Sequence, residues 1–265
     1  MINLLLYAGC ARAGSTWLYG ELNGRGDCDL SSIKEYFLFM DGFTLNPDFD
    51  KSSFFDHYRK LAENPEVKLL GEMSPSNGFA TIEQLKEFAT KATLYGFKVR
   101  PVIILRDPIN QKISETKLDV IAKLSLDSKE NMSDTFKRYR QNTSSDVPVA
   151  LDNVLTISVP FEYRLLNWEK TIENYRQVFG NIFIGFYETL FTENSMMELC
   201  EYLQIPYTDF NFTRVANKLL DVNEFTDEEK QMIYDTIPHC KQNYEYAVEN
   251  FGNDFIKSIW WTPNK

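Results

Sequence analysis

The start of the sequence carries residues that could bind a phosphate-like group. Residues 9–16 read GCARAGST and directly follow an apolar run at residues 3–8. This is the frame of the P-loop, G-x-x-x-x-G-K-[ST], except that Ser15 stands in the lysine position and the cation has moved to Arg12. Backbone N–H groups and a helix N-terminus can still bind an oxyanion there. Without the lysine, the loop is poorly equipped to hold the β- and γ-phosphates of a nucleoside triphosphate. The alternative is an ordinary strand-to-helix turn, which also favours glycine and serine.

A second candidate anion site follows the apolar run at residues 99–105. Arg106 stands directly after this expected strand, and open α/β sheets bind ligands at the carboxyl ends of their strands. Arginine can bind a phosphate through two parallel hydrogen bonds. Ser114 lies two helical turns further on and could add a hydroxyl. A surface ion pair between Arg106 and a neighbouring acid is the alternative interpretation.

A third candidate is the charged pair that opens Lys34-Glu35-Tyr36-Phe37-Leu38-Phe39. Desolvation beside bulky apolar residues raises the pKa of a carboxylate, which suits Glu35 to general-base work. An edge strand with polar flanks is the plainer interpretation. Residues 70–76, LGEMSPS, read as a strand end that turns into a loop and say little by themselves.

The elements that must position these residues follow an α/β pattern. Longer helical segments alternate with four short apolar runs that we expect to be strands, at residues 3–8, 67–71, 99–105 and 181–186. Such alternation predicts a central parallel sheet flanked by helices, with a P-loop-like nucleotide-binding core. The length of 265 residues fits one domain over the whole chain.

Helix starts and one irregular segment can also be located. Helices are expected to begin at the capping box Thr81–Gln84, at Asp107-Pro108 and at Thr226-Asp227-Glu228-Glu229, with a final helix at residues 241–251. Residues 125–160 are rich in serine, aspartate and asparagine, which is typical of a surface excursion, and we expect a lid or an acceptor-side segment there.

Composition excludes several classes of function. A net charge of −10 argues against a nucleic-acid partner. The four cysteines show neither paired spacing nor a metal-ligand pattern, which favours a reducing compartment. The first expected strand begins within three residues of Met1, which leaves no room for a signal peptide, and no apolar run approaches the ~18 residues of a membrane span. A cytoplasmic protein without a membrane or metal partner is therefore expected.

Together these segments resemble the sulfotransferases that use 3′-phosphoadenosine-5′-phosphosulfate (PAPS), closest to the carbohydrate and bacterial branch. Residues 12–17, RAGSTW, match that family's 5′-phosphosulfate loop, G-x-[RK]-x-G-[ST]-T-W. Arg106-Asp107-Pro108 with Ser114 matches the 3′-phosphate motif R-D-P-x(5)-S. Residues 34–39 are similar to K-E-P-x-F-F, with Tyr36 in the proline position, and residues 187–190 resemble Y-E-D-L. The resemblance extends from residue 1 to about residue 205.

The resemblance implies a transfer of the sulfuryl group from PAPS to an acceptor hydroxyl by in-line displacement, without a metal. Glu35 would be the general base, and Arg12 would stabilise charge on the bridging oxygen. The implied cofactor-binding residues are the loop residues Arg12, Ala13, Gly14, Ser15 and Thr16 for the 5′-phosphosulfate, Trp17 and Tyr187 for the adenine, and Arg106 and Ser114 for the 3′-phosphate. A carbohydrate or small-molecule acceptor is favoured, and the oligomeric state is open.

The chain also departs from the family pattern. Many carbohydrate-type members carry E-K-T-P-x-Y where residues 72–77 read EMSPSN, so the family's lysine is Met73 here. The histidine base of the small-molecule branch has no counterpart, since His57 and His239 fall in helical stretches. For the basic loop that closes over the cofactor, the chain offers only Arg214 or Lys218. Two alternatives stay open: a small-molecule kinase or other P-loop NTPase, and a catalytically inactive nucleotide-binding module.

Overall fold

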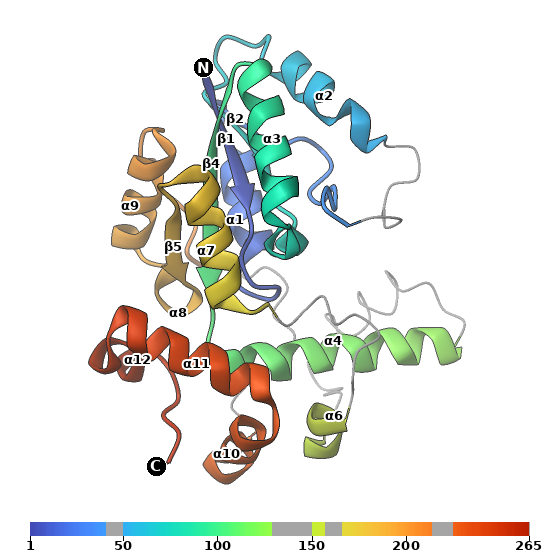
Figure 1. Cartoon of the computed structure of the whole chain (residues 1–265), viewed down its shortest axis with the longest axis vertical. Helices are drawn as coiled ribbons and strands as arrows, with labels where there is room; N and C mark the ends of the chain where they lie inside the picture. Colours follow the sequence, from blue (N-terminus) through green and yellow to red (C-terminus); the bar gives the residue numbers. More distant parts are fainter. Residues whose placement is uncertain (41–49, 129–149, 157–165, 214–224, 265) are drawn as a thin grey trace. The chain divides into compact units, whose positions relative to one another are not determined.

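The computed structural model describes residues 1–40, 50–128, 150–156, 166–213 and 225–264 (Figure 1). They form two compact units, each considered by itself below. The first unit comprises Met1–Leu105 and Trp168–Arg214, and the second comprises Arg106–Asn167 and Val215–Lys265. The expectation of one domain over the whole chain stays a prediction.

The first unit is built on a five-stranded sheet in which all described pairings are parallel. Its strand order is β2-β3-β1-β4-β5. The strands are β1 (Ile2–Tyr7), β2 (Cys28–Asp29), β3 (Leu69–Glu72), β4 (Phe97–Leu105) and β5 (Phe183–Phe186). β1 lies at the centre, and its residues Leu4, Leu5 and Leu6 have no exposed surface. A continuous apolar run is what a strand covered on both faces requires.

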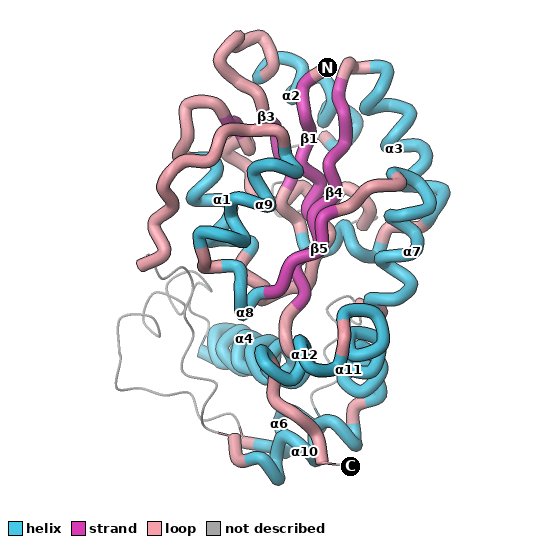
Figure 2. Tube along the Cα trace, turned by 90° about the vertical axis from the view of Figure 1, so that its left-hand side faces the viewer, coloured by secondary structure: helices cyan, strands magenta, loops and turns pink. Residues whose placement is uncertain are grey.

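Helices cover both faces of this sheet. Figure 2 shows α1 (Ser15–Asn23) and α9 (Glu193–Leu203) on one face, and α3 (Ile82–Leu94) and α7 (Trp168–Phe179) on the other. Each buries an apolar stripe, with Leu18 and Leu22 from α1 and Trp168 and Tyr175 from α7 among the buried residues. The remaining elements of the unit are η1 (Lys51–Ser53), α2 (Phe54–Leu61), η2 (Pro75–Phe79) and α8 (Tyr187–Leu190).

The second unit is helical in its described part. It contains α4 (Pro108–Ser128), α6 (Leu151–Thr156), α10 (Asp227–Thr236), α11 (Pro238–Phe251) and α12 (Asn253–Ile259). Four of these helices, α4, α6, α10 and α11, together with the residue at position 225 before α10, share a core of buried residues: Ile109, Ile113, Val154, Phe225, Ile233 and Cys240. The expected lid at residues 125–160 lies mostly outside the described residues. Within it α6 is a helix, and its Val154 belongs to this core.

The predicted α/β class with a central parallel sheet is confirmed, as are the four predicted strands to within two residues at their starts. The predicted capping box at Thr81 with Gln84 is present, and the helix start predicted at Thr226 is also a capping box, with Glu229. Asp107 caps α4 through its carboxylate, which accepts hydrogen bonds from the N–H groups of Ile109 (2.8 Å) and Asn110 (3.0 Å).

One strand was missed, and one local interpretation was wrong. The sequence did not predict β2, which is only two residues long and therefore carries no periodic signal. The edge-strand interpretation of residues 34–39 fails because this segment has no strand structure. Its backbone is held instead by the side chains of Glu72 and Ser74, as described below.

Candidate functional site

The loop between β1 and α1 has a shape that its two glycines make possible. A Cβ on Gly9 would lie 2.6 Å from the backbone nitrogen of Ile104, so the loop begins too close to β4 for any side chain. Gly14 adopts φ 83, a left-handed conformation that favours glycine, and a Cβ there would lie 2.9 Å from Cδ2 of Leu190. Packing against β4 therefore requires the first glycine of the P-loop frame, and the left-handed backbone conformation requires the second.

The middle of the loop is sharply turned. Arg12 has φ 63, which is uncommon for a residue with a side chain. The hydroxyl of the buried Tyr7 lies 3.5 Å from the carbonyl oxygens of both Cys10 and Ala13. Left-handed residues in such turns build concave backbone surfaces that bind anions. The loop then leads into α1, where Ser15 is the first helical residue.

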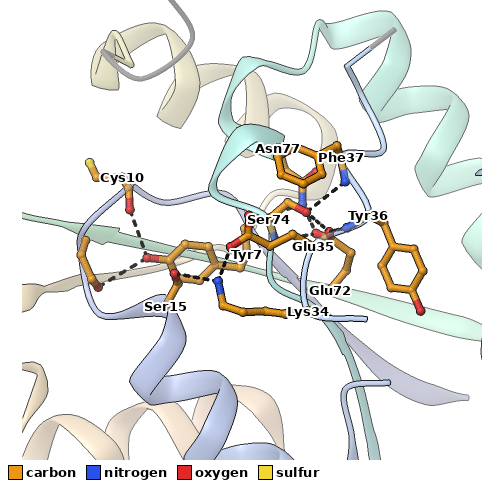
Figure 3. A network of polar contacts seen from close by, with 11 residues as sticks. Tyr7, Cys10, Ser15, Lys34, Glu35, Tyr36, Phe37, Glu72, Ser74 and Asn77 are labelled. Carbon is orange, nitrogen blue, oxygen red and sulfur yellow. Dashed lines mark hydrogen bonds and ion pairs between the residues drawn. The ribbon is translucent and has the colours of Figure 1, made fainter. Parts of the chain in front are cut away.

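A cation from another segment reaches the start of α1. The ammonium group of Lys34 donates a hydrogen bond to the hydroxyl of Ser15 (3.3 Å) and also pairs with the carboxylate of Glu35 (Figure 3). The side chains of Lys34 and Glu35 keep 20% and 27% of their surface exposed, so both are accessible. The structure thus brings a lysine to the position where the sequence has replaced the P-loop lysine by serine. The spacing of 19 residues between Lys34 and Ser15 gives no signal of this contact.

Three hydrogen bonds hold the backbone of residues 34–37 against the end of β3. The N–H of Met73 donates to the carbonyl of Lys34 (3.2 Å). The N–H of Tyr36 donates to the carboxylate of Glu72 (3.0 Å), and that of Phe37 donates to the hydroxyl of Ser74 (3.1 Å). Two of the three partners are side chains, which take the place that backbone groups of a neighbouring strand would have in an edge pairing.

Glu72 is the centre of this arrangement, and sequence reasoning missed it. The residue has no exposed surface, and its carboxylate accepts four hydrogen bonds: from the N–H of Tyr36, the N–H and hydroxyl of Ser74, and the side-chain amide of Asn77. No cation pairs with it within the described part of the chain. Burial raises the pKa of Glu72 to about 7, and its hydrogen bonds offset this only in part.

The other predicted residues of the first unit lie around the same loop, with one correction. Thr16 is half-buried in the first turn of α1, and Tyr187 packs against Gly14, whose Cβ would lie 3.4 Å from Cδ2 of the tyrosine. Trp17, expected to stack on adenine, is only 1% exposed. Its ring packs edge-on against Phe191 and stacks on Phe212, so an adenine finds no free face there.

The predicted 3′-phosphate residues belong to the second unit. Arg106 directly follows the last residue of β4 and is 7% exposed, while Ser114 lies in α4 and is 6% exposed. Asp107, between Arg106 and the helix, is fully buried and also accepts a hydrogen bond from the N–H of Trp261 (3.1 Å). Arg214 and Lys218, suggested as closing residues, lie outside the described residues.

The histidines, cysteines and carboxylates complete the chemical inventory. His57 lies in α2 with Nε2 3.0 Å from the hydroxyl of Ser31, and His239 is exposed on α11. The four cysteines are free and buried. The described residues contain no group of three or more His, Cys, Asp or Glu side chains placed to hold a metal ion. Among these residues, no helix is both long and apolar enough to cross a membrane.

A solved structure shares this architecture. A sulfotransferase from Alicyclobacillus acidocaldarius superimposes with a TM-score of 0.50, at 14% identity over 91% of this chain and 94% of that chain. The chain has a sulfotransferase fold. The sulfotransferase domain from the curacin biosynthetic pathway is also similar, with a TM-score of 0.41 and 18% identity over 78% of this chain and 75% of that chain. No protein-family model and no curated protein sequence matches. The resemblance that the motifs indicated is thus confirmed at the level of the sulfotransferase fold.

Proposed function

We propose that this protein transfers a sulfuryl group from PAPS to the hydroxyl of an acceptor, a carbohydrate or a small molecule. The observation that carries the proposal is the meeting of Lys34, Glu35 and the N-terminus of α1 at one point of a sulfotransferase fold. An anion site, a cation and an accessible carboxylate are the groups that such a transfer needs.

The residues present fit a phosphosulfate group. The close approach at Gly9 and the left-handed Gly14 give a loop whose backbone can contact an anion directly. The ammonium of Lys34 beside Ser15 adds a positive charge that a neutral strand-to-helix turn would lack. This combination favours the proposal over the interpretation of residues 9–16 as an ordinary turn.

Sulfuryl transfer depends on positioning and electrostatics, as phosphoryl transfer does. PAPS supplies the sulfuryl group, whose bond to the bridging phosphate oxygen breaks as the acceptor oxygen bonds to sulfur. Glu35 takes the proton that the acceptor hydroxyl loses. Arg12 stabilises the negative charge that develops on the bridging oxygen, and Lys34 contributes charge at the start of α1.

The remaining motif residues have binding roles in this proposal. The backbone of Ala13, Gly14 and Ser15 with the hydroxyl of Thr16 holds the 5′-phosphosulfate. Arg106 and Ser114 recognise the 3′-phosphate, and Tyr187 faces the adenine. Trp17 supports the loop by packing and is not given a stacking role. The reaction as proposed requires no metal ion.

A ligand comparison tests the nucleotide assignment. The thermal stability of the protein is measured with 3′,5′-adenosine bisphosphate, with AMP, and with ATP plus Mg²⁺. A ligand that binds the folded state raises the unfolding temperature. The bisphosphate should raise it most, because it alone carries the 3′-phosphate that Arg106 and Ser114 are proposed to bind. Arg106→Ala should abolish the preference for the bisphosphate over AMP, while Arg59→Ala, at an exposed position of α2, should leave it unchanged.

Turnover is tested separately, by incubation with PAPS and a panel of hydroxyl acceptors and a search for products heavier by one sulfonate group. Preferential stabilisation by ATP plus Mg²⁺ would overturn the proposal in favour of a kinase. Bisphosphate binding without transfer to any acceptor would overturn it in favour of an inactive nucleotide-binding module.

A further inference from the structure

We propose that Glu72 is a positioning residue that holds the Lys34–Glu35 pair against the start of α1. Glu72 itself does not touch the reacting groups, because its side chain has no exposed surface and both carboxylate oxygens accept hydrogen bonds from within the protein. The catalytic consequence rests on the proposed function, whereas the positioning can be measured without it.

The connection from Glu72 to the candidate base is short. Glu72 accepts the N–H of Tyr36, the residue that follows Glu35 in the chain. It also accepts the hydroxyl hydrogen of Ser74, and the oxygen of that hydroxyl accepts the N–H of Phe37. One carboxylate thereby fixes two consecutive peptide groups directly after Glu35, one of them through Ser74 (Figure 3).

The segment needs this support. Phe37 adopts φ 52, a left-handed conformation that costs on the order of 1 kcal/mol or more in a residue with a side chain. Such a conformation persists only when the surroundings fix it. The bond from Met73 to the carbonyl of Lys34 fixes the other end of the segment. With both ends held, Lys34 is placed so that its ammonium group reaches Ser15.

The polar side of the cluster is anchored to the rest of the sheet. The side-chain amide of Asn77 donates to Glu72 and to the carbonyl of Tyr7, the last residue of β1 before the loop (3.0 Å). The cluster therefore joins the segment that carries Lys34 and Glu35 to the strand that carries the candidate anion-binding loop. A displacement of about 1 Å between two such groups can cost roughly 100-fold in rate.

Glu72→Gln is the decisive variant because it keeps the side-chain volume and removes one acceptor oxygen. Every group that contacts the Glu72 carboxylate donates a hydrogen bond to it. The NH₂ of a glutamine would itself be a donor and would face these donors. Tyr175→Phe is the matched control. Tyr175 is equally buried and donates to the backbone carbonyl of Asn77 (2.8 Å), but it makes no hydrogen bond to residues 34–37 in the described structure.

The first measurement is hydrogen exchange of the amides of residues 34–37, followed on the corresponding peptides. We expect exchange in Glu72→Gln to be at least about 10-fold faster than in the wild type, and Tyr175→Phe to leave it unchanged there. Unchanged exchange in a folded Glu72→Gln protein would overturn the positioning role, whether or not the protein transfers sulfuryl groups. If Glu72→Gln does not fold, Ser74→Ala decides in the same way, because it removes the hydroxyl that joins Glu72 to the N–H of Phe37 and leaves the bond from Tyr36 to Glu72 in place.

The second measurement separates kcat from binding. In Glu72→Gln we expect kcat to fall about 10- to 100-fold while the dissociation constant of 3′,5′-adenosine bisphosphate stays within about twofold. A loss of bisphosphate affinity equal to the loss of kcat would contradict the proposal, since it would place Glu72 in the support of the nucleotide site. If the wild type shows no transfer, the proposed function fails and hydrogen exchange alone judges the positioning.

Discussion

The stability of the protein should depend on pH through Glu72, and the variant Glu72→Gln isolates this dependence. Burial raises the pKa of Glu72 to about 7 from the ordinary value of 4.5. A carboxyl group with a raised pKa binds its proton more tightly in the folded protein than in the unfolded chain. Its stabilising contribution is therefore fully present below pH 4.5 and is lost as the pH rises through about 7.

The size of this effect follows from the two pKa values. Each pKa unit corresponds to about 1.4 kcal/mol, so the whole difference amounts to roughly 3 kcal/mol. Between pH 5 and pH 8 roughly 2 to 3 kcal/mol of it should disappear, because the unfolded chain is already largely ionised at pH 5. This is a large share of the ~5–15 kcal/mol by which folded proteins are stable.

The neighbours of Glu72 do not obscure the measurement. The groups that face it are the phenols of Tyr36, Tyr58 and Tyr175, and burial raises the pKa of each above its ordinary value of 10. They remain neutral from pH 5 to pH 8. Other groups that titrate in this range, such as His57, are common to both proteins and cancel in the difference.

The assay is urea denaturation followed by tryptophan fluorescence, at intervals from pH 5 to pH 8, on the wild type and Glu72→Gln. We expect the wild type to lose roughly 2 to 3 kcal/mol relative to the variant across this range. A difference that is constant to within about 0.5 kcal/mol would refute the reasoning. It would mean that the four hydrogen bonds outweigh desolvation and keep Glu72 ionised throughout.

Two further predictions concern the cations of the site. Arg12→Ala should lower kcat by about 100-fold and weaken PAPS binding much less, because the charge on the bridging oxygen develops as its bond to sulfur breaks and is absent from bound PAPS. Normal turnover of that variant in a sulfuryl-transfer assay would remove the role of Arg12. Lys34→Ala should lower kcat/KM for PAPS by roughly 10- to 100-fold, and Lys34→Arg should restore part of it, since the charge beside Ser15 is kept. Equal kinetics of Lys34→Ala and the wild type would show that the ammonium does not contribute.

Much of the fold was predictable because its signals are local. Residues 101–105 of β4 are apolar throughout and buried, as a strand covered on both faces requires. The capping box at Thr81 depends on two side chains three residues apart, so four consecutive residues are enough to predict it. The signal at Gly14 in the turn of residues 9–16 is similarly local, because the glycine is needed for its own left-handed backbone conformation.

The parts that were not predictable depend on contacts between distant segments. In the sequence, Glu72 is indistinguishable from any glutamate at the end of an apolar strand. Its importance appears only in the fold, where the N–H of Tyr36, 36 residues earlier in the chain, donates to its carboxylate. Trp17 occupies a motif position, yet its ring packs against Phe191 and Phe212, which lie far from it in the sequence. No spacing rule contains either fact.

The P-loop frame itself indicates less about the ligand than its letters suggest. Gly9 is required because β4 passes too close for a side chain, and Gly14 because the chain enters α1 from a left-handed conformation. Both requirements hold whatever the loop binds, so the glycines cannot distinguish a triphosphate from a phosphosulfate. The cations can. A lysine inside the loop follows the loop wherever it moves, whereas Lys34 depends on a separate segment that the end of β3 holds in place. The charge at this site is therefore tied to the position of Glu35, and moving one must move the other.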